Sequence, residues 1–208
     1  RKAGVSMGEH QMVLHGNEYM LEKLGDYEFM ISADSFFQTN TRQAEKLYDI
    51  IFEESQLTGS EIVYDLFCGT GSISLYLSKH AKMVYGFELV ASAVQDAMQN
   101  AIHNKVKNAW FFGGNLENLF HKNPEAKGLE APDVVVVDPP RAGLHIKTIE
   151  DIIEKSPKRI VYVSCNPASQ ARDVALLCNE KYELKKLRPI DMFPHTPHVE
   201  NVATLILK

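Results

Sequence analysis

The spacing of hydrophobic and polar residues changes along the chain. It separates a short extended part from a longer part that alternates between strands and helices. Residues 11–32 form short extended pieces separated by turn-forming pairs such as Gly25-Asp26, which predicts a small β meander. From Thr41 the apolar residues recur at helical spacing. Asn40 or Thr39 can cap this helix, because a short polar side chain accepts a hydrogen bond from a free amide of the first turn.

After residue 59 the chain alternates between apolar runs of strand length and amphipathic stretches, such as 91–103 and 169–179, that fit helices. The four valines at 134–137 are apolar on both faces of the pleat, which is typical of a central strand covered on both sides. This alternation predicts an α/β fold with a doubly wound, mostly parallel sheet. A proline-rich connection without a helix signal joins the last two strands, which predicts an antiparallel hairpin with the final strand reversed. The expected strands are 62–67, 83–88, 109–112, 134–138, 160–164, 183–188 and 202–207.

Composition fits one globular unit rather than a fibrous, disulfide-rich or membrane-spanning chain. The 208 residues are 45% hydrophobic and 24% charged, and none of the three cysteines lies in a Cys-x-x-Cys pair. No apolar run approaches the roughly 18 residues of a membrane span. We therefore expect a cytoplasmic monomer with no membrane contact and no metal site. Because the chain begins at Arg1 rather than Met, we also expect it to be part of a longer protein.

The charge distribution restricts where a nucleic acid could bind. The net charge is −5, which argues against a free-standing nucleic-acid binder. Residues 139–208 nevertheless carry 11 Lys/Arg against 8 Asp/Glu, and Lys185, Lys186 and Arg188 cluster there. A nucleic-acid contact is therefore expected in the last third of the chain, although a solvated strand edge explains the cluster equally well.

A glycine-containing segment, residues 65–72, follows the first strand of the sheet and leads into a helix. Glycines allow close approach of a ligand to the backbone, and Glu88 at the end of the next strand is placed to accept hydrogen bonds from a ribose. Nicotinamide enzymes use a similar plan, but the position of their third glycine is Ser74 here. The carboxyl of Asp65 also suits the amino group of a methionine moiety. The pattern favours S-adenosylmethionine over a dinucleotide.

The central strand ends in Asp138, which is followed by two prolines and Arg141. Paired prolines stiffen this loop and can hold the rim of a site rigid against a planar base. Methyltransferases that act on amino groups use a related motif in which an aromatic residue follows the prolines. Because Arg141 stands there instead, methyl transfer to an amino group is disfavoured.

Cys165 lies at the end of the fifth strand and immediately before a helix. A thiol near helix amides can have a lowered pKa and act as a nucleophile. Cys178 fits an ordinary buried helix position, and Cys68 lies beside the glycine segment. Cys165 differs from both because it lies between polar residues at the edge of the sheet where ligands bind. It is the candidate nucleophile.

Five segments stand in order along the chain: Phe36-Phe37-Gln38-Thr39-Asn40, Asp65-Leu66-Phe67-Cys68-Gly69-Thr70-Gly71, Asp138-Pro139-Pro140-Arg141-Ala142-Gly143, Ser164-Cys165-Asn166-Pro167 and His198-Val199-Glu200-Asn201. Together they resemble the S-adenosylmethionine-dependent RNA uracil-C5 methyltransferases, which make 5-methyluridine in ribosomal or transfer RNA. The resemblance runs from about residue 30 to the C-terminus. It implies a Rossmann-like class I methyltransferase fold, with a seven-stranded mostly parallel sheet whose last strand is antiparallel, preceded by the short meander.

The resemblance also implies roles for individual residues. Cys165 matches the nucleophile that adds to C6 of uracil, and Glu200 matches the base that removes the C5 proton. His198 competes for the role of base because the ordinary pKa of histidine lies near neutrality. Ser72 falls where some members of the family carry an asparagine. The positions that match contacts with the cofactor are Gln38, Phe67, Ser72, Glu88, Asn115 and Asp138.

The implied organisation is a short β lead-in over residues 1–38 and a methyltransferase catalytic domain over residues 39–208. Full-length members of the family usually carry an N-terminal RNA-binding barrel, and many add an iron–sulfur cluster, for which no suitable cysteines precede Cys68. We therefore expect an isolated catalytic domain that takes its methyl group from S-adenosylmethionine. Its expected partner is RNA, with ribosomal RNA favoured over transfer RNA.

The implied reaction needs the target base to leave its stack, at a cost of a few kcal/mol. Phe36 or Phe37 could stack on that base, although an aromatic residue is more often an ordinary part of the core. One alternative function is a thiol hydrolase that pairs Cys165 with His195 or His198, which leaves the glycine segment unexplained. Another is a non-catalytic RNA-binding remnant, against which the presence of both the cysteine and the glutamate argues. A metal site from the two histidines is disfavoured because a proline lies between them.

Overall fold

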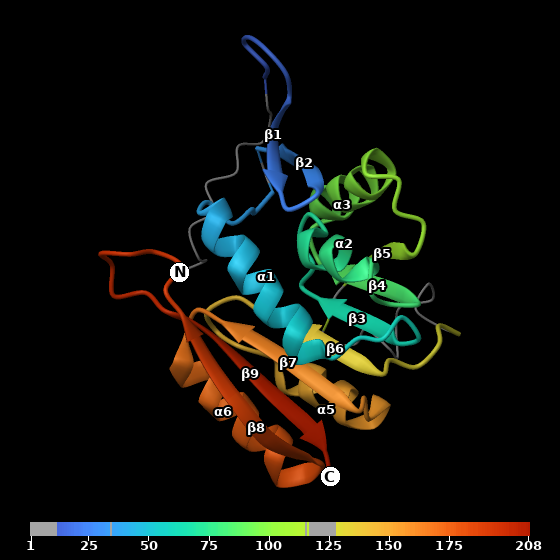
Figure 1. Cartoon of the computed structure of the whole chain (residues 1–208), viewed down its shortest axis with the longest axis vertical. Coiled ribbons are helices and arrows are strands. Elements are labelled where there is room, and N and C mark those ends of the chain that lie inside the picture. The colour runs from blue at the N-terminus through green and yellow to red at the C-terminus, as the bar shows by residue number, and fades with distance from the viewer. Residues whose placement is uncertain (1–11, 34, 115, 117–127) are drawn as a thin grey trace.

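The computed structural model describes residues 12–33, 35–114, 116 and 128–208, and a seven-stranded sheet runs through its middle (Figure 1). The strands are β3 (Ile62–Leu66), β4 (Met83–Glu88), β5 (Ala109–Gly113), β6 (Val134–Val137), β7 (Arg159–Ser164), β8 (Tyr182–Ile190) and β9 (Glu200–Leu207). Their order in the sheet is β5-β4-β3-β6-β7-β9-β8. The first five pair in parallel, whereas β9 is antiparallel to both β7 and β8. The predicted fold, including the reversed last strand, is confirmed.

Helices cover both faces of the sheet and create two separate cores. On one face lie α1 (Thr41–Ser55), α2 (Ser72–Ser78) and α3 (Ala91–His103), and on the other lie α5 (Ile146–Lys155) and α6 (Pro167–Glu180). In Figure 1, α1 crosses in front of the sheet and α5 and α6 lie behind it. Val134 and Val136 belong to the first core and Val135 and Val137 to the second. The run of valines is therefore a central strand covered on both sides, as predicted.

A helix that could cross a lipid bilayer does not occur in the part of the chain that the structure describes.

The N-terminal hairpin packs onto the sheet domain through α3. Its strands, β1 (Tyr19–Leu24) and β2 (Tyr27–Ser32), pair antiparallel, as the predicted meander requires. Leu24 and Phe29 are fully buried in the first core. The buried Asn100 of α3 accepts a hydrogen bond from the Met30 amide at 2.7 Å and donates to the carbonyl of Thr70 at 3.1 Å. One side chain thus connects the hairpin to the glycine segment. The boundary between lead-in and catalytic domain at residue 38 stays a prediction.

The structure moves the start of the last strand. β9 begins at Glu200, two residues before the predicted strand, because Ile190 pairs with Glu200 and Ser164 pairs with Asn201. β8 correspondingly continues through Pro189, which an edge strand tolerates because one side of it needs no amide donor. Glu200 is therefore part of a strand and not of the connecting loop where the sequence pattern placed it.

The basic residues of β8 are engaged in ion pairs with α1. Glu54 is buried, and its carboxylate accepts hydrogen bonds from Lys186 at 2.7 Å, Arg188 at 3.0 Å and Thr204 at 2.9 Å. Burial raises the pKa of Glu54, but these hydrogen bonds outweigh it and hold the pKa below its usual value. Lys185 pairs with Glu183 on the same strand. This cluster fastens α1 to the edge of the sheet and is not an open basic surface.

We predict that Glu54→Gln lowers the free energy of unfolding by about 1–3 kcal/mol, because it weakens hydrogen bonds that join α1 to two strands. Urea denaturation measures the change. The matched control is Glu53→Gln, which also loses a contact with Arg188 but from a side chain that is 59% exposed. This control should change stability by less than about 1 kcal/mol. Equal losses in the two variants would contradict a special role for the buried carboxylate.

Candidate functional site

The candidate site lies at the carboxyl ends of β3 and β6, where the direction of strand order reverses and where open α/β sheets bind ligands. A small pocket opens there. Four of the six residues expected to contact a cofactor line it, namely Gln38, Phe67, Ser72 and Asp138. The pocket is completed by Phe36, Phe37, Tyr48, Cys68, Gly69, Thr70 and Ile73.

The glycine segment turns sharply after β3 and forms one wall of the pocket. Phe67 adopts a left-handed backbone conformation with φ of 67°, which is rare for a residue with a side chain and is often found at functional sites. The amides of Phe67 and Cys68 both donate to the carbonyl of Phe87, at 2.9 and 3.1 Å. A Cβ on Gly69 would have its nearest neighbour at 3.9 Å, whereas one on Gly71 would lie 2.8 Å from Phe111. Gly69 thus presents open backbone to a ligand, and Gly71 is required by internal packing.

Glu88 holds the glycine segment rather than lining the pocket. One carboxylate oxygen accepts a hydrogen bond from the amide of Gly69 at 3.1 Å, and the other accepts from the amides of Leu89 and Val90. These bonds join the loops that follow β3 and β4. Glu88 therefore lies next to the site, as predicted, with its oxygens already partly used by the backbone.

Ser72 and Asn115 are two further residues that were expected to contact the cofactor. The hydroxyl of Ser72 lies 2.7 Å from that of Tyr48, so it links α2 to α1 as well as facing the pocket. Asn115 lies outside the described residues.

Two carboxyl groups at the pocket have few partners, namely the fully buried Asp65 and the partly exposed Asp138. Asp65 is fully buried, and one oxygen accepts a hydrogen bond from Ser74 at 2.6 Å, while the other has no hydrogen-bond partner among the described residues. Burial, with the nearby charge of Glu88, raises the pKa of Asp65 to about 7. Burial and the charges of Glu200 and Asp65 raise the pKa of Asp138 to about 8. Such groups favour a ligand that brings positive charge or hydrogen-bond donors.

Thr70 is a residue of the pocket that sequence reasoning did not single out. Its hydroxyl oxygen is buried and has no hydrogen-bond partner in the described part of the chain. Its place inside the glycine motif was the only available signal, because a threonine in a loop is otherwise common.

The structure brings Cys165 and Glu200 together. Ser164 at the end of β7 pairs with Asn201 of β9, so the neighbouring residues Cys165 and Glu200 lie side by side where the two strands diverge. Glu200 is only 7% exposed, and Cys165 is partly exposed. The charge of Glu200 raises the pKa of both Cys165 and Asp138, so the three groups lie close enough to influence one another.

The predicted lowering of the Cys165 pKa is wrong for the free protein. Burial and the charges of Glu200 and Asp138 raise the pKa of this thiol and outweigh the charge of Arg141 and a backbone hydrogen bond at Cys165, which lower it. The following helix α6 does little to stabilise the thiolate. Its first residue is Pro167, which has no amide hydrogen, and the Asn166 side chain accepts the Ala168 amide at 3.1 Å. A helix terminus already capped in this way has few free amides for a thiolate.

Arg141 is the second residue whose role the sequence did not reveal. Its positive charge lowers the pKa of both Cys165 and Glu200, although burial still keeps the pKa of Glu200 above its ordinary value. In the sequence, Arg141 counted only against methyl transfer to an amino group and as part of the family motif. Its position three residues after Asp138, at the end of a central strand, was the available signal.

The two histidines considered as alternatives lie in the loop before β9. Both are exposed, and in the described residues neither ring makes a hydrogen bond or ion pair with Cys165. No group of three or more His, Cys, Asp or Glu side chains in the described ranges is arranged to hold a metal ion. The geometry therefore places Glu200, and not a histidine, beside the candidate nucleophile.

Comparison with known proteins identifies the family. The family model described as tRNA (uracil-5-)-methyltransferase matches residues 5–208. The chain belongs to this family. The resemblance seen in the motifs is thereby confirmed.

Relatives in this family are longer than the chain. An uncharacterized RNA methyltransferase from Chlorobaculum tepidum is 49% identical over 98% of this chain and 42% of its own length. One from Staphylococcus aureus is 48% identical over 99% of this chain and 45% of its own length. The chain thus spans less than half the length of these curated relatives.

A solved structure supports the same assignment. The tRNA (uracil-54, C5)-methyltransferase of Pyrococcus abyssi, solved in complex with S-adenosyl-L-homocysteine, is 38% identical and superposes with a TM-score of 0.82. The match covers 99% of this chain and 48% of that one. Fold and family therefore agree over the whole described sheet.

We predict that Asp65→Asn stabilises the protein at pH 8 by about 1–3 kcal/mol, because it replaces a buried carboxyl by a neutral amide. The folded state raises the pKa of Asp65 to about 7, so it binds a proton that the unfolded chain releases above about pH 4. The free energy of unfolding of the unmodified protein therefore falls as pH rises from about 4 to 7, and the variant lacks this loss. Thermal unfolding at pH 5 and pH 8 measures the difference. If Asp65→Asn stabilised the protein more at pH 5 than at pH 8, the raised pKa of Asp65 would not be the cause.

Proposed function

We propose that the protein transfers a methyl group from S-adenosylmethionine to C5 of a uridine in RNA, with Cys165 as nucleophile and Glu200 as base. The observation that carries the proposal is the placement of a partly exposed thiol and a buried carboxyl side by side, next to the pocket that Asp138 lines. C5 of uracil is a poor nucleophile, so its methylation requires both groups together.

The charged and polar groups at the pocket suit S-adenosylmethionine. The cofactor carries an ammonium and a sulfonium charge, which suit the unpaired oxygen of Asp65 and the carboxyl of Asp138. Gln38 and Phe67 line the same pocket, and Glu88 fixes the open backbone at Gly69. Ser72 and Asn115 complete the set of proposed contacts. When bound, the cofactor supplies an electrophilic methyl group. The Pyrococcus abyssi relative was solved with the corresponding demethylated product, which supports this choice.

The remaining chemistry belongs to the side chains of this chain. The thiolate of Cys165 adds to C6 of the uracil, forming a carbon–sulfur bond and moving electrons to an enolate at C4–C5. After C5 has taken the methyl group, the carboxylate of Glu200 accepts the C5 proton, and the carbon–sulfur bond breaks to regenerate the thiolate. Burial raises the pKa of Glu200, which makes its carboxylate a stronger base than an exposed one.

Phe36 is the aromatic residue that we assign to stacking on the extruded base. Its side chain is 71% exposed and it lines the pocket. Phe37, in contrast, packs against Phe29 with ring centroids 5.5 Å apart and serves the core of the hairpin. An exposed aromatic at the rim of a pocket is suited to holding a base that has left its stack.

We propose that residues 39–208 form the catalytic domain and act as a monomer on RNA. The relatives' names leave the RNA unspecified except in Pyrococcus abyssi, where it is transfer RNA. Ribosomal RNA is the substrate that we would test first. Mapping 5-methyluridine in ribosomal and transfer RNA, from cells with and without the gene, identifies the substrate.

We predict that Cys165 forms a covalent bond with RNA that contains 5-fluorouridine, in the presence of S-adenosylmethionine. Fluorine cannot leave C5 as a cation, so elimination stops after methyl transfer and the adduct survives denaturation. Gel mobility of the labelled RNA and mass mapping of the peptide detect it. Cys165→Ala should give no adduct, whereas the control Cys178→Ala should give as much as the unmodified protein. A trapped adduct in Cys165→Ala would show that another residue is the nucleophile.

We predict that Glu200→Gln accumulates a methylated covalent enzyme–RNA species on an ordinary uridine substrate. The amide cannot accept the C5 proton, so addition and methyl transfer proceed but elimination is blocked. Turnover should fall by about 10²-fold or more, the usual contribution of a general base. His198→Ala serves as the control and should turn over normally. The opposite result, with the adduct in the histidine variant only, would transfer the role of base to His198.

A further inference from the structure

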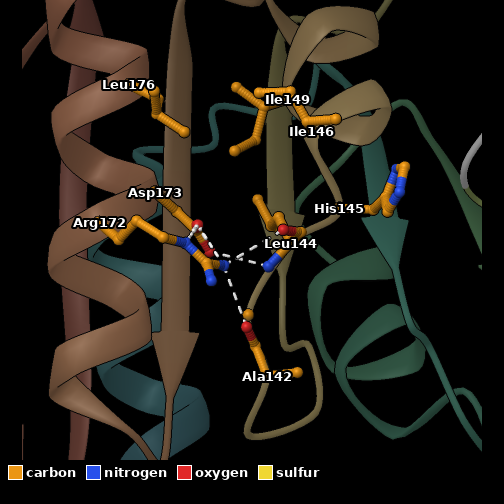
Figure 2. Close-up of a pocket in the computed structure, with 9 residues that line it drawn as sticks. Ala142, Leu144, His145, Ile146, Ile149, Arg172, Asp173 and Leu176 are labelled. Atoms are coloured by element: carbon orange, nitrogen blue, oxygen red, sulfur yellow. Dashed lines mark hydrogen bonds and ion pairs between the residues drawn. The ribbon is translucent and has the colours of Figure 1, made fainter.

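A second hollow, of about 510 Å³, lies next to the candidate site between the start of α5 and the middle of α6 (Figure 2). One side of it is formed by residues 142–145, in the loop that follows the two prolines, and the other side carries Arg172 and Asp173 of α6. The proposed mechanism gives neither of these α6 residues a task. Both nevertheless make several hydrogen bonds.

Asp173 is a fully buried carboxylate whose oxygens are all engaged. One oxygen accepts hydrogen bonds from the amide of Leu144 and the hydroxyl of Tyr162, both at 2.7 Å. The other accepts from the guanidinium of Arg172 at 2.8 Å. A buried carboxylate that is paired and fully hydrogen-bonded holds its partners in a defined geometry, because each lost bond would leave a charge unsatisfied.

Arg172 binds the same loop through backbone carbonyl groups. Its guanidinium donates to the carbonyl of Ala142 at 3.0 Å and to that of Leu144 at 3.3 Å, as Figure 2 shows. The pair therefore binds both an amide and two carbonyls of the loop. Since the Arg172 side chain is 55% exposed, its removal does not open a cavity in the core.

Gly143 shows how closely the loop approaches this pair. Its φ is 80°, and a Cβ on it would lie 2.4 Å from a carboxylate oxygen of Asp173 and 2.8 Å from the guanidinium of Arg172. No other residue fits this position without a shift of the loop or of the helix. The backbone of the loop at Gly143 is thus packed directly against the side chains of Arg172 and Asp173.

The residue at the start of this loop is Arg141, and the same helix holds its backbone. Asn166 and Ser169 both donate to the Arg141 carbonyl, at 2.8 and 3.0 Å. Residues 166, 169, 172 and 173 lie on one face of the first two turns of α6, because residues three and four apart are neighbours on a helix. One helix face therefore fixes every residue of the loop from Arg141 to Leu144.

Asn166 directly follows Cys165 and binds the Arg141 carbonyl, so the start of this loop lies beside the nucleophile. We propose that Arg172 and Asp173 are positioning residues that hold Arg141 there. This inference rests on the proposed function, in which Cys165 and Glu200 do the chemistry. The groups that act on the Cys165 thiol are Glu200 of β9 and Asp138 after β6, which disfavour the thiolate, and Arg141, which favours it. An exposed arginine contributes only while its backbone keeps it near the thiol, because charge interactions in water weaken with distance. Asp138 is held differently, by its own amide on the carbonyl of Leu66.

The test measures how fast iodoacetamide alkylates Cys165 as a function of pH, with mass mapping to separate this cysteine from Cys68 and Cys178. Arg172→Met keeps the apolar stem and removes the guanidinium. It should slow alkylation at pH 7.5 by about threefold to tenfold and shift the profile to higher pH by about 0.5–1 unit. Arg141→Gln should give the same shift, and the double variant no more than either alone. Asp173→Asn should act in the same direction if it folds.

The matched control is Lys147→Gln, which removes an exposed positive charge from the neighbouring helix without touching the loop. Its alkylation profile should equal that of the unmodified protein. The affinity for S-adenosylmethionine, measured by calorimetry, should change less than about twofold in Arg172→Met, because Asp138 is anchored separately. A purely structural defect would lower this affinity and the thermal midpoint together instead of shifting the pH profile alone.

Two results would overturn the inference. One is an unshifted profile in Arg172→Met while Arg141→Gln is shifted, which would mean that the pair does not position the arginine. The other is an unshifted profile in Arg141→Gln, which would mean that the charge of Arg141 does not act on the Cys165 thiol. Alkylation needs no RNA, so these outcomes are independent of the fluorouridine experiment. If only the fluorouridine experiment fails, the proposed function is refuted. The alkylation profiles would still show whether Arg172 and Asp173 position Arg141.

Discussion

Three carboxyl groups that are buried or partly buried at the carboxyl ends of the central strands set the conditions for the rest of the site. Asp65 lies in β3, Asp138 directly follows β6 and Glu200 begins β9. Each raises the pKa of at least one other acid or of the Cys165 thiol. Such an arrangement opposes folding at neutral pH, because burial disfavours each charged form and the charges repel one another. A protein keeps such a cluster where a bound ligand benefits from it, and here the cluster surrounds a pocket with open glycine backbone.

The sheet supplies the rigidity that this cluster requires. Asp65 and Asp138 are at the ends of adjacent parallel strands, whose register is fixed by continuous pairing. Glu200 reaches the same edge only because β9 runs in the opposite direction between β7 and β8. A residue far along the chain thus becomes a direct neighbour of Cys165. The ion cluster around the buried Glu54 fastens α1 to β8 and β9 and so helps to hold β9 in place.

Much of this arrangement could be predicted from the sequence. The period of apolar residues gave the bounds of α3 and the start of α1, and the proline-rich connection indicated the reversed strand. The start of β9 was missed because Glu200 is polar and its pairing with Ile190 depends on the tertiary register. The direction of the Cys165 pKa shift was also missed. It depends on carboxyl groups that are distant in sequence and on a helix terminus whose amides are already used.

That last point explains why a loop arginine matters at this site. Many strand–helix junctions stabilise an anion with the free amides of the helix, but α6 begins with Pro167 and is capped by Asn166. Positive charge for the thiol must therefore come from a side chain, and Arg141 is the cation that acts on it. A long, solvent-facing side chain loses entropy when it is held in one place, so the cost falls when its backbone is already fixed. The face of α6 from Asn166 to Asp173 provides that fixed backbone. In this arrangement the helix acts on the nucleophile through the loop that it holds, rather than through its own terminus.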